Sequence, residues 1–154
     1  MKICIIKSRS IIEMSGSCME KSNVLVVEDN IDNYELVRYL LERAGHSALW
    51  ARSGREGIDM AKANQPELII MDLSLPEMDG WTATERIKSD PETGHIPIVA
   101  LTAHTLPGDR KRALDVGCDG YLSKPINISL FEETVAEILA RKQGWQESTG
   151  GSRL

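Results

Sequence analysis

The sequence predicts an α/β domain built around a parallel β-sheet. Strand-like and helix-like segments alternate five times along the chain, which is the pattern of parallel strands joined by right-handed helical crossovers. Three of the strand-like segments are almost continuously apolar, as expected for parallel strands that helices cover on both faces. With 154 residues, the chain is long enough for one well-buried domain and short for two.

Five segments rich in Val, Ile and Leu are the predicted strands, and polar or turn residues bound each of them. They are VLVVED from residue 24, SALWA from 47, ELIIMD from 67, IPIVALT from 96 and GYLSK from 120. Their lengths are ordinary for strands in globular proteins.

The first predicted helix follows from apolar residues spaced by three and four positions: Val37, Leu40, Leu41 and Ala44. Gly45 is its predicted C-terminal cap. A second helix is predicted from about residue 55 to 63, ended by the breaker at 64–66. A third begins near residue 79 or 80, and a fourth runs from about 107 to 117. The last helix places five residues on one face, namely Leu130, Thr134, Val135, Ile138 and Leu139, and ends in basic residues, as its dipole favours.

The two ends of the chain lie outside this alternation. Residues 22–142 form the predicted domain, residues 1–21 a flexible N-terminal extension and residues 143–154 a flexible Gly/Ser-containing tail. Met14 and Met19 are both alternative initiators, so the leading segment need not belong to the native protein. Because the last helix takes up much of the chain after Pro125, we expect no attached DNA-binding or enzymatic output domain.

Composition excludes several classes of function. The 23 acidic and 18 basic residues give a net charge of -5 without a basic stripe, which argues against direct DNA binding. The chain has no run of about 18 apolar residues and no signal-peptide pattern, so we expect no membrane association. Cys4, Cys18 and Cys118 show no metal-ligand or CxxC spacing, which favours free thiols in the cytoplasm.

Polar residues stand at four of the predicted strand ends. Glu28 and Asp29 end the first strand, Asp72 the third and Thr102 the fourth, and Lys124 follows the fifth. Ligands of parallel sheets bind beyond the carboxyl ends of the strands, so we expect these side chains to lie together at one edge.

Clustered carboxylates at this edge predict a Mg²⁺ site. Two carboxylates about 5 Å apart repel by roughly 3 kcal/mol at an effective dielectric near 20, and a hard dication with oxygen ligands relieves that repulsion. Lys124 would hold a phosphoryl oxygen, and the Thr102 hydroxyl would donate a hydrogen bond to another. The chemistry that fits best is in-line attack by Asp72 on a phosphoryl group, with the backbone carbonyl of Ser74 completing the metal shell.

Four blocks of the sequence resemble the signature blocks of the receiver domain of two-component response regulators. They are VLVVEDN, IIMDLSLPEMDG, IPIVALTAH and GCDGYLSKPI, and the likeness covers about residues 23–142. The resemblance implies a flavodoxin-like, doubly wound, five-stranded parallel sheet of strand order 2-1-3-4-5. It also implies Mg²⁺ dependence and a phosphoryl donor histidine on a sensor histidine kinase or a histidine phosphotransfer protein.

The resemblance also assigns roles to single residues. It makes Asp72 the phosphoacceptor, with Glu28 and Asp29 as the other metal-site acids. Thr102 resembles the switch hydroxyl and Lys124 the lysine that pairs with the phosphoryl group.

Further positions follow from the same resemblance. Tyr121 resembles the aromatic residue that turns inward on phosphorylation, and the bond before Pro125 resembles one that is cis in this family. Residues 107–141 would form the face that binds a downstream protein. Ser74 and His104 occupy positions that tune dephosphorylation, and they leave the lifetime of the phosphorylated form open.

Several functions remain open at this point. The leading one is a stand-alone receiver that switches partner binding and is not a turnover enzyme. A phosphorelay intermediate that passes its phosphoryl group to a histidine phosphotransfer protein is the main alternative. A haloacid-dehalogenase-type phosphatase would need a second acid where Ser74 stands, and a flavodoxin would need a phosphate-binding loop where the acidic VEDN stands. A phosphorylation-independent scaffold would be expected to have lost one of the key residues.

Overall fold

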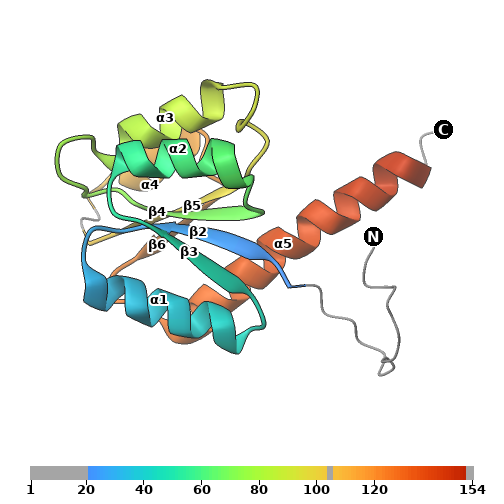
Figure 1. The fold of residues 1–154 in the computed structure, drawn as a ribbon, viewed down its shortest axis with the longest axis horizontal. Helices are drawn as coiled ribbons and strands as arrows, with labels where there is room; N and C mark the ends of the chain where they lie inside the picture. The colour runs from blue at the N-terminus through green and yellow to red at the C-terminus, as the bar shows by residue number, and fades with distance from the viewer. Residues whose placement is uncertain (1–20, 104–105, 152–154) are drawn as a thin grey trace.

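The computed structural model describes residues 21–103 and 106–151, and the side chains of residues 21–103 and 106–141. Within these residues, five parallel strands form one sheet between two layers of helices (Figure 1). The strands are β2 (Asn23–Val27), β3 (Ser47–Ala51), β4 (Leu68–Asp72), β5 (Ile98–Thr102) and β6 (Gly120–Ser123). Their order in the sheet is β3-β2-β4-β5-β6. Numbered along the chain this is 2-1-3-4-5, so the predicted fold class is confirmed.

The helices follow the strands in strict alternation. They are α1 (Ile31–Arg43), α2 (Gly54–Asn64), α3 (Gly80–Ser89), α4 (Asp109–Asp115) and α5 (Ile128–Gly151). Helices α1 and α5 cover one face of the sheet, and α2, α3 and α4 cover the other (Figure 1). The predicted strands start within two residues of the observed ones, and Gly45, with a φ of 93°, lies just past α1 as predicted.

Two helices are capped directly beside the candidate site. The side chain of Asn30 accepts a hydrogen bond of 3.0 Å from the Asn33 amide at the start of α1. The side chain of Asp79 likewise accepts one of 2.8 Å from the Thr82 amide at the start of α3. Such caps satisfy amides that have no partner within the helix, and they stabilise it by about 1 kcal/mol each. The loops that carry the site acids are therefore anchored to rigid helices.

Each face of the sheet has its own apolar core. Residues of β4 and β5 are buried throughout, which explains why these two segments read as continuous apolar runs. Toward α1 and α5 the sheet packs against residues that include Val37, Leu40, Leu41, Phe131 and Val135. Toward α2, α3 and α4 it packs against residues that include Ala61, Ala83, Ile87 and Ala113. Because the sheet is held on both faces, the carboxyl ends of its strands form a fixed edge.

Helix α5 is longer than predicted. Its backbone is helical to Gly151, whereas the sequence placed the end of the domain at residue 142. The sequence from residue 143 predicts a Gly/Ser-containing tail, but a glycine within a helix costs only about 1 kcal/mol, and no proline follows to end the helix. The backbone of residues 143–151 therefore continues α5, and the flexibility of this segment stays a prediction.

Some predictions fall on residues that the structure does not describe. They concern almost all of the N-terminal extension, with Cys4, Met14, Cys18 and Met19, and also His104. No helix formed by the described residues is both long and apolar enough to cross a membrane.

Candidate functional site

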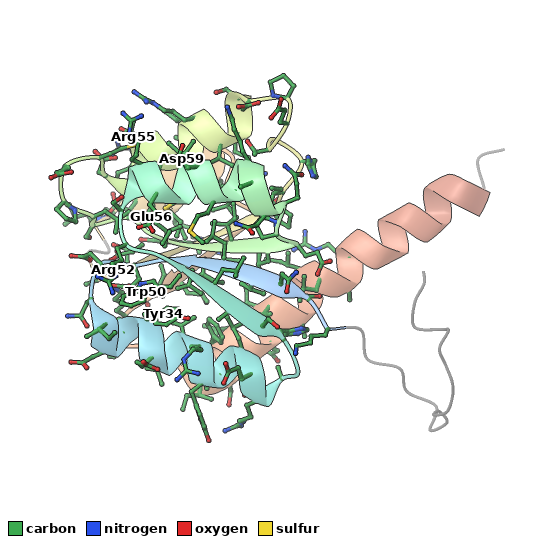
Figure 2. The ribbon with its side chains drawn as sticks, viewed as in Figure 1. Tyr34, Trp50, Arg52, Arg55, Glu56 and Asp59 are labelled. Atoms are coloured by element: carbon green, nitrogen blue, oxygen red, sulfur yellow. The ribbon has the colours of Figure 1, made fainter. Side chains whose placement is uncertain are left out.

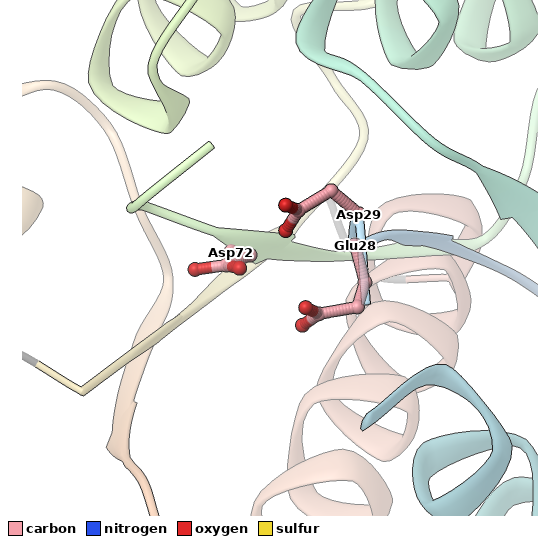
Figure 3. Close-up of side chains that lie close together, drawn as sticks. All are labelled: Glu28, Asp29 and Asp72. Atoms are coloured by element: carbon pink, nitrogen blue, oxygen red, sulfur yellow. The ribbon is translucent and has the colours of Figure 1, made fainter. Parts of the chain in front are cut away.

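Three acidic side chains meet at the carboxyl edge of the sheet. Glu28 and Asp29 follow β2, and Asp72 is the last residue of the adjacent strand β4. One carboxylate oxygen from each of the three lies within 4.8 Å of the others. Figure 3 shows the three side chains close together at the site. Glu28 and Asp72 are only 2% and 3% exposed, whereas Asp29 is exposed. The predicted convergence of these acids is present in the structure.

Lys124 connects two of these acids. Its Nζ lies 3.2 Å from Glu28 Oε1 and 3.3 Å from Asp72 Oδ2. Its backbone amide donates a 2.8 Å hydrogen bond to the carbonyl of Thr102, which ties it to the end of β5. The following Lys124–Pro125 peptide bond is cis, as the resemblance implied. The lysine therefore belongs to the same cluster as the acids.

The Glu28 carboxylate is held from the start of α1. Its Oε2 accepts hydrogen bonds of 3.3 Å from the backbone amide of Asn30 and from the side-chain amide of Asn33. Burial, and then the negative charge of Asp72, raise the pKa of Glu28, and the ammonium of Lys124 offsets this only in part. A further positive charge would therefore stabilise the charged carboxylates of the cluster. The sequence analysis did not predict this contact of Asn33. The only sequence feature that points to it is that Asn33 is a polar residue in the first helical turn after Glu28 and Asp29.

Asp72 is oriented by the loop that follows it. Its Oδ1 accepts a 2.9 Å hydrogen bond from the amide of Ser74, and its Oδ2 faces Lys124. The amide of Gly80 donates to the carbonyl of Leu73 at 3.3 Å, which closes the loop against the strand end. This hydrogen bonding explains why a buried strand ends in an acid and a structured turn. The role of the Ser74 carbonyl as a metal ligand stays a prediction.

Thr102 lies on β5, which pairs with β4, and Tyr121 lies on β6, the edge strand beyond β5. Thr102 is buried at the end of β5, and in the register of the sheet Asp72 lies opposite its neighbour Leu101. Tyr121 in β6 packs, partly buried, against the core under α2, α3 and α4, and burial raises the pKa of its hydroxyl. Both residues are on the elements that the sequence predicted, and their switching roles stay predictions.

The donor set fits a magnesium ion. All three candidate ligands are carboxylates, which are hard oxygen donors, and the exposed Asp29 marks a side of the cluster that water can reach. Mg²⁺ is typically held by one or two carboxylates and keeps several waters. The structure offers no cysteine or histidine ligand at this cluster among the residues that it describes.

The sequence matches the family model of the response regulator receiver domain over residues 24–136. The chain belongs to this family. It is 44% identical over 121 residues to the polar-differentiation response regulator DivK of Brucella ovis, which covers 79% of this chain and 98% of the relative. The corresponding protein of Brucella anthropi is 43% identical over the same length. The chain is therefore a response regulator of two-component signal transduction.

Solved structures resemble the receiver fold described above. One is the receiver domain of the sensor histidine kinase PA1611 from Pseudomonas aeruginosa, with 30% identity, a TM-score of 0.72 and coverage of 79% of this chain and 99% of that one. That structure has a magnesium ion coordinated in its active-site cleft. Another is the chemotaxis protein CheY4 of Vibrio cholerae, with 28% identity, a TM-score of 0.72 and coverage of 77% and 99%. Receivers are not turnover enzymes in the usual sense, and neither is this chain.

Proposed function

We propose that this receiver accepts a phosphoryl group on Asp72 from a phosphohistidine, with Mg²⁺ held by Glu28, Asp29, Asp72 and the Ser74 carbonyl. The observation that carries the proposal is the convergence of three carboxylates and one shared ammonium at a single sheet edge. The donor is a sensor histidine kinase or a histidine phosphotransfer protein in the cytoplasm. Bound Mg²⁺ would neutralise the charge of the phosphoryl oxygens as they approach the acids.

The residues of the chain position the transfer. A carboxylate oxygen of Asp72 attacks phosphorus, the bond from phosphorus to the donor imidazole nitrogen breaks, and the imidazole leaves with that electron pair. The Ser74 amide fixes the nucleophile through its 2.9 Å hydrogen bond. The Lys124 ammonium, already next to Asp72, is in place to pair with a phosphoryl oxygen, and the Thr102 hydroxyl would donate to another.

The output would pass through the face formed by α4, β6 and α5, residues 107–141. Exposed apolar side chains support this proposal, since they favour contact with a protein partner: Leu114, Ile128 and Leu130. Phosphorylation would alter this face through Thr102 and Tyr121. To move from 1% to 99% active, such a switch needs roughly 5.5 kcal/mol of differential stabilisation.

Labelling with a small phosphodonor tests the phosphoacceptor. In the presence of Mg²⁺, intact-mass spectrometry should show one added phosphoryl group on the wild type and none on Asp72→Asn. The matched control is Asp59→Asn, since Asp59 is an exposed acid on α2 and should leave labelling unchanged. Circular dichroism would establish that Asp72→Asn is folded. Persistent labelling of folded Asp72→Asn would place the nucleophile elsewhere.

A second measurement separates the terminal switch from a phosphorelay intermediate. The phosphorylated protein is mixed with candidate histidine phosphotransfer domains, and the label is followed by gel electrophoresis. Retention of the label on Asp72 supports the switch, and rapid transfer to a partner histidine supports the relay. Steady release of phosphate from small phosphate esters would favour a phosphatase instead.

A further inference from the structure

The backbone carbonyl of Glu28 has an unusual partner. The indole Nε1 of Trp50 donates a 2.8 Å hydrogen bond to it. Trp50 lies in β3, the edge strand next to β2, and the two residues are 22 positions apart in the sequence. The amide of Glu28 donates to the carbonyl of Ala51 at 2.9 Å, so β3 supplies both partners of the Glu28 main chain. The sheet ladder accounts for the second bond, but only the Trp50 side chain accounts for the first.

The Trp50 ring is itself fixed in place. Tyr34 of α1 stacks on it, with ring centroids 4.5 Å apart and planes within 9° of each other. The guanidinium of Arg52 lies over the same ring, 4.3 Å from its centroid. Figure 2 shows the three side chains next to one another at the end of β3. Stacking and cation–π contacts of this kind hold an aromatic ring in one orientation, so the indole N–H is offered at a fixed position.

The hydrogen bond from Trp50 affects the candidate metal ligands through the peptide group that joins Glu28 and Asp29. The carbonyl of Glu28 and the amide of Asp29 belong to one planar unit, so fixing the carbonyl sets the plane from which Asp29 continues. Glu28 precedes this unit and Asp29 follows it, and both side chains belong to the carboxylate cluster. Asp29 is exposed, so packing around its side chain does little to orient it.

From this geometry we infer that Trp50 is a positioning residue for the metal site, which sets the relative placement of the Glu28 and Asp29 carboxylates. The inference rests on the proposed function, because it concerns the Mg²⁺ that the phosphoacceptor uses. Removing a residue that hydrogen-bonds to a metal ligand without touching the metal typically weakens metal binding by 10–100-fold. Loss of the indole donor should therefore weaken Mg²⁺ binding without removing any ligand.

Two changes at position 50 separate the donor from the packing. Trp50→Phe keeps an aromatic ring for the stack and lacks the N–H. A tryptophan analogue with sulfur in place of the indole N–H, introduced at position 50 alone, keeps the full ring shape as well. The matched control is Tyr34→Phe, which retains the stacked ring and leaves the hydrogen bond to Glu28 intact.

Calorimetry of Mg²⁺ binding and urea unfolding without Mg²⁺ give the decisive readouts. We expect the Mg²⁺ dissociation constant to rise about tenfold in both Trp50 variants and less than about twofold in Tyr34→Phe. The Mg²⁺ concentration for half-maximal phosphorylation should rise by the same factor, with the maximal rate retained at saturating Mg²⁺. In the metal-free protein, the backbone amide resonance of Asp29 should shift in the Trp50 variants only.

The possible failures are distinguishable. One outcome is an unchanged Mg²⁺ dissociation constant in the sulfur analogue, with or without a loss of stability. Trp50 would then be a packing residue only, and this inference would fail while the proposed function stands. A wild-type protein that binds no Mg²⁺ and takes no label on Asp72 would overturn the proposed function, and this inference with it.

Discussion

The ammonium of Lys124 lies between two buried carboxylates, 3.2 Å from Glu28 Oε1 and 3.3 Å from Asp72 Oδ2. One positive charge is thus shared by two negative charges at the carboxyl ends of different strands, and Asp29 adds a third acid beside them. The side chain of Lys124 is 17% exposed, so water screens these contacts only weakly. The arrangement holds the acids together while leaving a net negative charge for a dication to neutralise.

The first prediction concerns removal of this shared charge. Lys124→Met keeps most of the apolar stem but leaves two buried carboxylates uncompensated, so the metal-free protein should lose about 3 kcal/mol of unfolding free energy. Mg²⁺ should bind more tightly to the variant, because a competing cation is gone from the site. Urea unfolding in the presence of a chelator and calorimetric titration with Mg²⁺ measure the two effects.

Lys62→Met is the control for this experiment. Lys62 pairs with Asp90 at 3.1 Å, but its side chain is 48% exposed, so water screens the pair. Lys62→Met should leave the Mg²⁺ affinity unchanged and should affect the free energy of unfolding far less than Lys124→Met does. Weaker Mg²⁺ binding in Lys124→Met would mean that the ammonium mainly holds the acids in place and does not compete with the metal.

The α/β class and the meeting of the acids could be predicted because both follow from local patterns, whereas the strand order was implied by the receiver-domain resemblance. Continuous apolar runs indicate parallel strands covered on both faces, and parallel strands bring their carboxyl ends to one edge. An acid at the end of the first strand and another at the end of the third must then lie close together when those strands are neighbours. Glu28 and Asp72 meet this condition, since β2 pairs with β4.

The contacts around Glu28 could not be predicted in the same way. The hydrogen bond from Trp50 and the stack with Tyr34 join side chains from different elements, and no spacing in the sequence encodes their orientation. The sequence alone therefore gives no sign that Trp50 contacts Glu28. The length of α5 was missed for a different reason, since helix ends depend on small differences in propensity around Gly144.

The second prediction concerns the close approach of Gly80 to the end of β4, where Asp72 lies. A Cβ at position 80 would overlap the carbonyl oxygen of Asp72 and lie 2.6 Å from the Cα of Leu73. Helix propensity alone would make Gly80→Ala stabilising by about 1 kcal/mol, but the clash is with backbone and should cost about 1–3 kcal/mol. Because Asp72 must move, labelling by a phosphodonor should slow as well.

Gly45→Ala serves as the comparison for this variant. Gly45 also has a backbone role, with a φ of 93°, yet a Cβ there would meet nothing within 4 Å. Alanine at position 45 should cost about 1–2 kcal/mol through its conformation alone and leave the labelling rate unchanged. Equal labelling rates for Gly80→Ala and the wild type would show that α3 can move away without displacing Asp72.

The third prediction concerns pH and His46. The Nδ1 of this half-buried imidazole accepts a 3.3 Å hydrogen bond from the Ser22 amide, and burial lowers the pKa of His46. His46 therefore takes up its proton at a higher pH in the unfolded chain than in the folded protein. The stability contribution is complete above the unfolded pKa of about 6.5 and is lost as pH falls from there through the lower folded pKa.

Urea unfolding at about pH 7.5 and about pH 5.5 tests this sign. His46→Asn keeps an acceptor near the Nδ1 position but does not titrate, so it should lose less stability than the wild type between the two pH values. His95 is exposed, and His95→Asn should retain the pH dependence of the wild type. If all three proteins lose stability equally, carboxyl groups and not His46 account for the loss.

The fourth prediction concerns the reactivity of Cys118, which lies buried just before β6. Burial, assisted by the charge of Asp119, raises the pKa of the Cys118 thiol to about 11. Since the thiolate is the reactive form, alkylation at pH 8 should be about 240-fold slower than for a free cysteine of pKa near 8.5, and shielding should slow it further. Iodoacetamide labelling of a Cys4→Ser, Cys18→Ser variant isolates this thiol. In urea, its labelling rate should rise in step with the unfolded fraction. Labelling of the native protein at the rate of a free thiol would instead mean that the segment between α4 and β6 opens readily.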